Sequence, residues 1–99
     1  MTKLAPMHPG EVLREEFLKP FNLSANKLAD RCRVPRTRIE RIAAEETSIT
    51  ADTALRLSKA FGNSADFWLN LQSRYDLLTA EKELCKTLDK IERIEPAAA

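Results

Sequence analysis

The chain has 99 residues, the size of one domain that can bury a core without metal ions or disulfide bonds. It holds only two glycines, 31% of its residues are charged, and its formal net charge is +1, a composition that favours helices over sheets. The sequence has no apolar run long enough to span a membrane and no signal-peptide pattern at its start, so we expect a cytoplasmic protein without membrane contact.

Proline and serine mark the limits of the first helices. Pro9 suits the first turn of a helix, and Pro20 ends that helix because proline disfavours helical geometry in the residue before it. Ser24 is a good N-cap for a second helix, and Pro35 begins a third helix after a short break. The side chains that we expect to point inward from the second and third helices are Leu28, Ala29, Cys32, Ile39, Ile42 and Ala43.

The second half of the chain predicts two more helices and an amphipathic stretch. Thr50 caps a helix through Phe61, and Gly62 suits the left-handed residue that commonly stops one. Ser64 caps a fifth helix, in which Phe67, Trp68, Leu71, Tyr75 and Leu78 are spaced for burial. Residues 80–94 form a further amphipathic stretch, with Leu84, Leu88, Ile91 and Ile94 at helical spacing. The sequence therefore predicts an all-α fold.

The segment 24–42 predicts a helix-turn-helix. Ala29 is small where two helices must cross closely, and Val34 and Ile39 supply apolar contacts at that crossing. The segment contains six basic and two acidic side chains, a local charge of +4 on a nearly neutral chain, which indicates a polyanion bound to one face. A basic helix alone is more often a solvated surface, but a small residue, a turn and a second helix in this order favour DNA contact.

The outward side of the second helix of this motif suits the major groove of B-DNA. The groove admits one helix, arginine can donate two hydrogen bonds to guanine, and threonine can touch a thymine methyl group. We predict base contacts from Arg36, Thr37, Arg38 and Arg41. We predict phosphate contacts, which set register and affinity, from Ser24, Asn26, Lys27 and Arg33.

Four segments resemble the HigA-type antitoxins, also known as virulence-associated protein I, of the lambda-repressor-like (XRE) helix-turn-helix class. They are HPGEVLREEFL (8–18), VPRTRIERI (34–42), SITADTALRLSKAFG (48–62) and SADFWLNLQSRYDL (64–77). The resemblance implies a five-helix lambda-repressor-like DNA-binding domain over residues 7–78, with a C-terminal amphipathic helical extension over residues 79–95. In position, Arg36, Thr37 and Arg41 match base-facing residues of the family, with Arg38 beside them.

The resemblance also implies a function and partners. It implies a homodimer that binds a palindromic operator in double-stranded DNA, represses its own operon and neutralises a small ribosome-dependent mRNA-cleaving toxin. Two alternatives stay open, a stand-alone transcriptional regulator without a toxin and a toxin-binding module with little DNA affinity. The dimer surface expected on the fifth helix consists of Trp68, Leu71, Tyr75 and Leu78. The stretch 80–94 either packs on its own domain or dimer mate, which we favour, or is free to bind a toxin.

The sequence departs from the family pattern at two places. Arg33 stands where glycine is usual, and a non-glycine residue with positive φ costs about 1 kcal/mol. Glu45 and Glu46 stand where the loop after the recognition helix is usually basic, and carboxylates close to phosphates weaken DNA binding. Unless this loop turns away from DNA, we expect a modest and strongly salt-dependent affinity.

Nothing in the sequence indicates catalysis. The acidic residues alternate with Lys and Arg at helical spacing, which is typical of a solvated surface, and there is no glycine-rich phosphate loop. Cys32 and Cys85 are far apart and lack metal-ligand spacing, so we expect two free thiols in a reducing cell. His8 is expected to be structural or exposed to solvent. The sequence thus predicts no enzyme, no cofactor and no metal.

Overall fold

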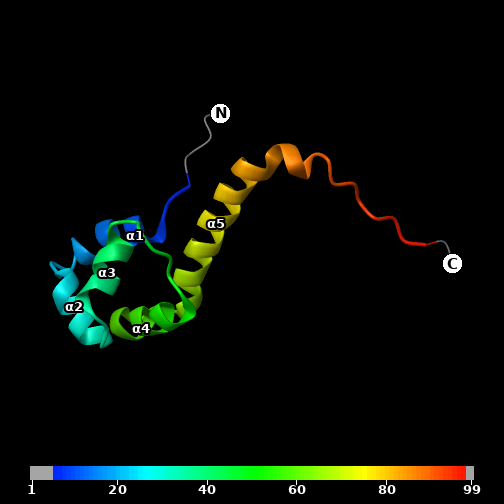
Figure 1. Ribbon diagram of the computed structural model, residues 1–99. Helices are drawn as coiled ribbons and strands as arrows, with labels where there is room; N and C mark the ends of the chain where they lie inside the picture. Colours follow the sequence, from blue (N-terminus) through cyan, green and yellow to red (C-terminus); the bar gives the residue numbers. More distant parts are fainter. Residues whose placement is uncertain (1–5, 98–99) are drawn as a thin grey trace.

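The computed structural model describes residues 6–97, and within that range it contains helices and no strand (Figure 1). The elements are α1 (Pro9–Val12), η1 (Leu13–Leu18), α2 (Ala25–Cys32), α3 (Arg36–Ala43), α4 (Ala51–Phe61) and α5 (Ala65–Leu88). Because α1 continues directly into the π-helical segment η1, the two form one helix, and the predicted five-helix, all-α fold is confirmed. None of the helices in this range is both long enough and apolar enough to cross a membrane.

Side-chain caps begin the helices where the sequence predicted them. The hydroxyl oxygens of Ser24, Thr50 and Ser64 accept hydrogen bonds from backbone N–H groups in the first turns of α2, α4 and α5. His8 caps α1 in the same way, because its Nδ1 accepts a hydrogen bond of 2.8 Å from the backbone N–H of Gly10. His8 is therefore buried and structural, and its ring lies edge-on against Tyr75, 4.9 Å between centroids.

The core is built from buried side chains of η1, α2, α3, α4 and the first half of α5. Its largest fully buried side chains are Trp68, Leu13, Leu28, Ile39, Ile42 and Leu57. The Trp68 side chain is 0% exposed, and its indole N–H donates a 3.0 Å hydrogen bond to Asn63 Oδ1. Phe17 and Phe61 stand beside the indole ring. This corrects the expectation that Trp68 belongs to a dimer surface, because the side chain has no exposed area with which to contact a second chain.

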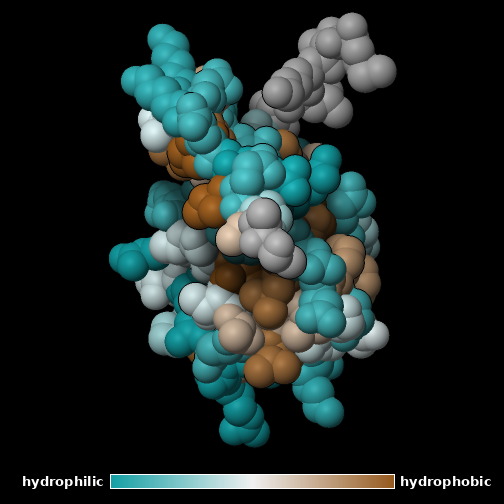
Figure 2. Space-filling model, turned by 90° about the vertical axis from the view of Figure 1, so that its right-hand side faces the viewer, coloured by the Kyte–Doolittle hydropathy of each residue, from teal (hydrophilic) through white to brown (hydrophobic). Residues whose placement is uncertain are grey.

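The fifth helix is longer than predicted and leaves the rest of the fold (Figure 1). The expected boundary between residues 78 and 79 falls inside α5, which continues without a break to Leu88. Residues 81–97 are exposed, so this stretch does not pack on its own domain. Ile91 and Ile94 were expected to extend the helical stripe, but residues 91–97 have no helical structure. The side of the molecule from which α5 leaves shows several hydrophobic areas open to solvent (Figure 2).

Candidate nucleic-acid interface

A tight left-handed turn joins α2 to α3. Arg33 adopts φ 58° and ψ 49°, so the residue at the usual glycine position does have the strained conformation that the sequence suggested. The N–H groups of Arg33 and Val34 donate to the carbonyls of Asp30 and Ala29 at 3.2 and 3.0 Å, which closes the end of α2 as a Schellman motif. Pro35 then precedes α3, where its missing N–H has no helical partner to lose. The predicted helix-turn-helix is confirmed.

The four predicted base-contacting residues lie on α3 but differ in their surroundings. Arg36, Thr37 and Arg41 are exposed, and only Arg36 has an ion pair, its Nε 3.4 Å from Glu40 Oε1 one turn along the helix. Within residues 6–97, Arg41 has no carboxylate partner. Arg38 differs, because it is half-buried and its Nη1 donates to Asp52 Oδ1 at 2.7 Å. The outward face of α3 thus offers Arg36, Thr37 and Arg41 to a ligand.

The predicted phosphate-contacting residues fall into two places. Asn26 and Lys27 are exposed in the first turn of α2, beside the hydroxyl of Ser24, which accepts from the Lys27 N–H at 3.1 Å. Arg33 lies past the other end of the same eight-residue helix, about 12 Å away at 1.5 Å per residue. The structure therefore groups Ser24, Asn26 and Lys27 and separates Arg33 from them.

Another polar edge, not foreseen from the sequence, adjoins the recognition helix. A hollow of about 570 Å³ is lined by Arg38 and Arg41 from α3, and by hydroxyl residues of the loop before α4 and of the first turn of α4, where Asp52 also lines it. Those hydroxyl residues are Thr47, Ser48, Thr50 and Thr53. Hydroxyl groups and a helix N-terminus are the usual partners of phosphate oxygens, so this edge complements the N-terminus of α2. The signal for it was the hydroxyl-rich run around the Thr50 cap.

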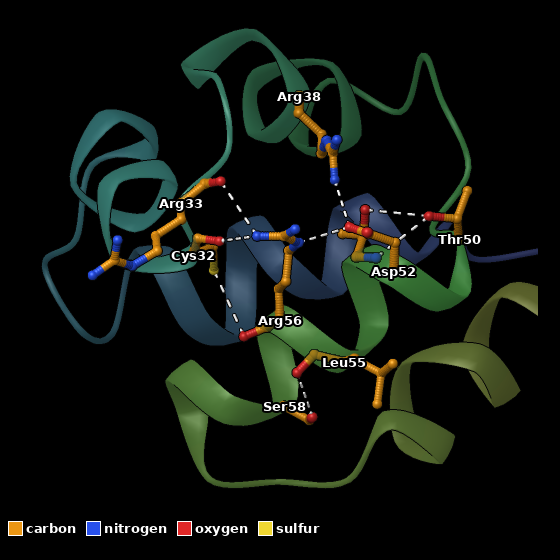
Figure 3. Close-up of polar contacts among 9 residues, drawn as sticks. Cys32, Arg33, Arg38, Thr50, Asp52, Leu55, Arg56 and Ser58 are labelled. Carbon is orange, nitrogen blue, oxygen red and sulfur yellow. Dashed lines mark hydrogen bonds and ion pairs between the residues drawn. The ribbon is translucent and has the colours of Figure 1, made fainter.

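Asp52 and Arg56, one turn apart on α4, link all three helices of this region (Figure 3). Asp52 Oδ1 accepts from Arg38 Nη1 on α3 and from Arg56 Nε, both at 2.7 Å. Arg56 Nη1 in turn donates to the carbonyl of Cys32 at 2.8 Å and to that of Arg33 at 3.3 Å. Hydrogen bonds first from Arg56 and then from Arg38 hold the pKa of Asp52 below its ordinary value. The sequence hinted at this arrangement only through the i,i+4 spacing of Asp52 and Arg56.

The acidic loop after α3 is partly neutralised from the first helix. Arg14 Nη2 lies 3.2 Å from Glu45 Oε2, and Arg14 Nη1 donates to the carbonyl of Ala43 at the end of α3. Glu45 itself has a positive φ of 64°. Glu46 is exposed and has no ion pair within the described part of the chain. One of the two carboxylates is therefore compensated internally, and the other still faces solvent.

Known proteins are similar to this chain in sequence and in structure. A family model described as helix-turn-helix matches residues 15–68. Virulence-associated protein I of Dichelobacter nodosus is 52% identical over 81 residues, 82% of this chain and 75% of that protein. Antitoxin HigA-1 of Vibrio cholerae is 37% identical over 76 residues, 77% of this chain and 71% of that protein. The chain belongs to the HigA-type family of helix-turn-helix proteins.

The three-dimensional comparison agrees with this family. The structure of the Pseudomonas aeruginosa antitoxin HigA with the higBA promoter has a TM-score of 0.87 to this HigA-type chain, with 43% sequence identity. It covers 91% of this chain and 99% of that one. The structure of antitoxin GraA in complex with its operator has a TM-score of 0.87 at 38% identity and covers 97% of this chain and 98% of that one. The predicted lambda-repressor-like fold is therefore confirmed.

The four residues predicted for the dimer surface of this HigA-type chain do not form one exposed surface in the structure. Trp68 lies in the core, Leu71 packs against the core, and Tyr75 contacts His8 of the same chain. Leu78 is half-buried. The large apolar side chains of α5 that are exposed are instead Leu77, Leu84, Leu88 and Phe67, at 60%, 46%, 44% and 37% exposure.

Proposed function

We propose that this chain is a DNA-binding antitoxin that binds a palindromic operator as a homodimer, represses its own operon and neutralises a small mRNA-cleaving toxin. The observation that supports DNA binding is the outward face of α3, where Arg36, Thr37 and Arg41 are exposed beyond a closed left-handed turn. The solved HigA and GraA structures with promoter and operator DNA support the same role. The proposal includes a cytoplasmic location, because the operator and the toxin would both be met there. It also includes no catalytic activity.

In this proposal the contacts divide by chemistry. Arg36, Thr37 and Arg41 contact base edges, and a good bidentate arginine contact gives about 1–3 kcal/mol of discrimination between bases. The first turn of α2, with Ser24, Asn26 and Lys27, binds phosphate oxygens on one side of the groove. Arg38 contributes through its pair with Asp52 and not through a base.

The homodimer in this proposal forms along α5. Leu77 follows Trp68 by nine residues, about two and a half turns, so it lies on the opposite side of the helix from the core. Leu84 and Leu88 continue that side at spacings of seven and four residues, and all three are exposed. A two-fold operator needs a two-fold protein, and an apolar helix face can bury itself against its own copy. We therefore assign the dimer contact to Leu77, Leu84 and Leu88.

An electrophoretic shift tests the DNA contacts. The probe is the duplex immediately upstream of the gene that encodes the chain, and the competitor is a scrambled duplex of equal length. Arg36→Ala and Arg41→Ala should lose the selective shift while circular dichroism stays helical, because each removes an exposed side chain. Arg93→Ala, an exposed arginine after α5, is the matched control and should bind like the wild type. Wild-type affinity in both α3 variants would show that the assigned face is wrong.

Sedimentation equilibrium tests the dimer. Leu84→Glu places a charge in the proposed contact and should shift the protein from dimer to monomer, whereas Leu55→Glu, at an exposed leucine on α4 outside that contact, should leave the dimer intact. A dimer that survives Leu84→Glu would contradict the assigned surface.

Glu46 favours a second candidate, a toxin-binding module with little DNA affinity, because this exposed carboxylate after α3, which has no ion pair within residues 6–97, repels phosphates. Co-purification with a small protein encoded beside its gene, together with no salt-sensitive DNA shift, would select this candidate. A selective shift and no such neighbouring gene would select a stand-alone regulator.

A further inference from the structure

We infer that Arg56 is the positioning residue of the recognition helix, because it holds the left-handed turn at Arg33 and, through Asp52, fixes Arg38 on α3; this rests on the proposed DNA-binding function. Figure 3 shows the Arg56 side chain between the end of α2 and the side chain of Asp52. Arg56 does not lie on α3, so it acts through its neighbours.

The turn at Arg33 needs this support. The left-handed conformation is strained for a residue with a Cβ, a strain that glycine avoids. The Schellman hydrogen bonds satisfy the carbonyls of Ala29 and Asp30, but those of Cys32 and Arg33 lie at the end of α2 without a helical partner. Arg56 Nη1 donates to both, and its positive charge is favourable at a helix C-terminus. Arg56 thereby stabilises a turn that the residue at position 33 disfavours.

The second half of the arrangement is a side-chain bridge between α3 and α4. Asp52 Oδ1 accepts from Arg56 and Arg38 at the same distance, 2.7 Å. The half-buried Arg38 side chain therefore bridges from α3 to α4, and this bridge restrains the rotation of α3 about its axis. Arg36, Thr37 and Arg41 share this helix, so their direction toward a groove depends on the same restraint.

The geometry of the guanidinium explains why arginine is needed at position 56. Its Nε donates to the Asp52 carboxylate while its Nη1 donates to the two carbonyls, so one planar group serves two directions at once. Lysine would keep the charge but has a single flexible ammonium group and cannot reproduce this fork. Arg56→Lys is therefore a variant that separates geometry from charge.

Loss of the fork should affect sequence choice more than general affinity. Contacts to phosphates depend mainly on charge, which Arg56→Lys retains, whereas contacts to base edges depend on the orientation of α3. We expect Arg56→Lys to bind the preferred duplex about tenfold more weakly, a loss comparable to one base contact, while binding a scrambled duplex almost as the wild type does. The salt dependence of binding should stay unchanged, since no phosphate contact is lost.

The experiment begins with selection of a preferred duplex from a random library by the wild-type chain. Dissociation constants for that duplex and a scrambled one are then measured over a range of salt concentrations for the wild type, Arg56→Lys, Arg33→Gly and the double variant. Arg33→Gly removes the strain at the turn. Arg56→Lys should therefore lower the affinity for the preferred duplex and the thermal stability less in the Arg33→Gly background than in the wild-type background. Arg74→Lys, an exposed arginine on α5, is the matched control.

The outcomes distinguish a failure of the inference about Arg56 from a failure of the proposed DNA-binding function. Equal losses on both duplexes, no loss at all, or the same effect of Arg56→Lys with Arg33 and with Gly at position 33 would overturn the inference. Failure of the wild type to enrich any sequence would overturn the proposed function instead. In that case the double-mutant cycle between positions 33 and 56, measured by thermal unfolding, still tests whether Arg56 holds the turn. A coupling of zero would overturn this role of Arg56 as well.

Discussion

The backbone of Gly10 lies directly against the carbonyl oxygen of Ile42, where α1 crosses the recognition helix α3. A Cβ atom built on Gly10 would overlap that oxygen and would also come within 3.1 Å of His8 Nδ1. The first helix therefore approaches the last turn of α3 so closely that no side chain fits at position 10. His8, which caps α1, and Ile42, which is buried in the core, are both held at this crossing.

Gly10→Ala should destabilise the fold. The overlap is with backbone, which cannot rotate away, so α1 and α3 must separate at a cost of about 1–3 kcal/mol even after the better helix propensity of alanine. Gly62→Ala is the control, because nothing lies within 4 Å of its added Cβ and only its positive φ of 77° opposes the change, at about 1 kcal/mol. Urea unfolding measures both. A Gly10→Ala variant as stable as the wild type would contradict the close approach.

The helix limits that depend on neighbouring residues were predictable from the sequence. Ser24, Thr50 and Ser64 cap helices because the cap hydrogen bond reaches only three residues along the chain. The end of α5 was not predictable in the same way. No glycine or proline stands near residue 79, so the helix continues, and the apolar spacing of Ile91 and Ile94 extends past its end at Leu88 without a partner to hold it.

The site shows a similar division. Exposure of Arg36 and Arg41 follows from the helical period once Ile39 and Ile42 point inward. The pairs that turn Arg38 toward Asp52 and join Arg14 to Glu45 cross 14 and 31 residues of sequence. Such contacts depend on how helices pack, which local patterns do not encode. The dimer prediction was wrong at Trp68 for the same reason, since periodicity shows that a face is apolar but not what covers it.

The two cysteines should differ in reactivity. Cys32 is buried, and burial raises the pKa of its thiol, although the charge of Arg56 opposes the shift. Cys85 is exposed on α5. Because the thiolate is the reactive form, a disulfide reagent at neutral pH should label Cys85 quickly and Cys32 only when the protein unfolds. Cys85→Ser should abolish the fast phase and leave the slow one; a fast phase that persists in Cys85→Ser would place Cys32 at the surface.

Asp52 should make stability depend on pH in acid. Its pKa is lowered in the fold by Arg56 and Arg38, so its contribution is fully present above the ordinary aspartate value near about 4 and is lost as the pH falls through the lowered value. The wild type should therefore melt at a higher temperature than Asp52→Asn at pH 7, and the difference should shrink below about pH 4. Asp66→Asn, an exposed aspartate in the first turn of α5, is the control. A Tm difference that is constant from pH 7 to pH 3 would show that the Asp52 carboxylate is not ion-paired.

Arg14 should matter more for stability than another cation on the first helix. It donates to the carbonyl of Ala43, which lies at the end of α3 without a helical donor, and it pairs with Glu45 in the following loop. Lys19 has only its pair with Glu15, a carboxylate that Arg14 Nε also contacts at 2.9 Å, and exposed pairs of that kind contribute little. Arg14→Met should therefore lower the Tm clearly more than Lys19→Met.

Arg14→Met should also change DNA affinity, which gives a second measurement beside the Tm. Without Arg14, the Glu45 carboxylate loses its partner close to the end of α3, so repulsion from phosphates should weaken binding to the upstream duplex, most strongly at low salt. Adding Glu45→Gln to Arg14→Met should restore much of the DNA affinity but little of the Tm, because the carbonyl of Ala43 still lacks its donor. If Glu45→Gln restored the Tm, Arg14 would stabilise the fold through the charge of the loop and not through the carbonyl of Ala43. If DNA binding stayed weak, repulsion by the Glu45 carboxylate would not be the cause of the loss.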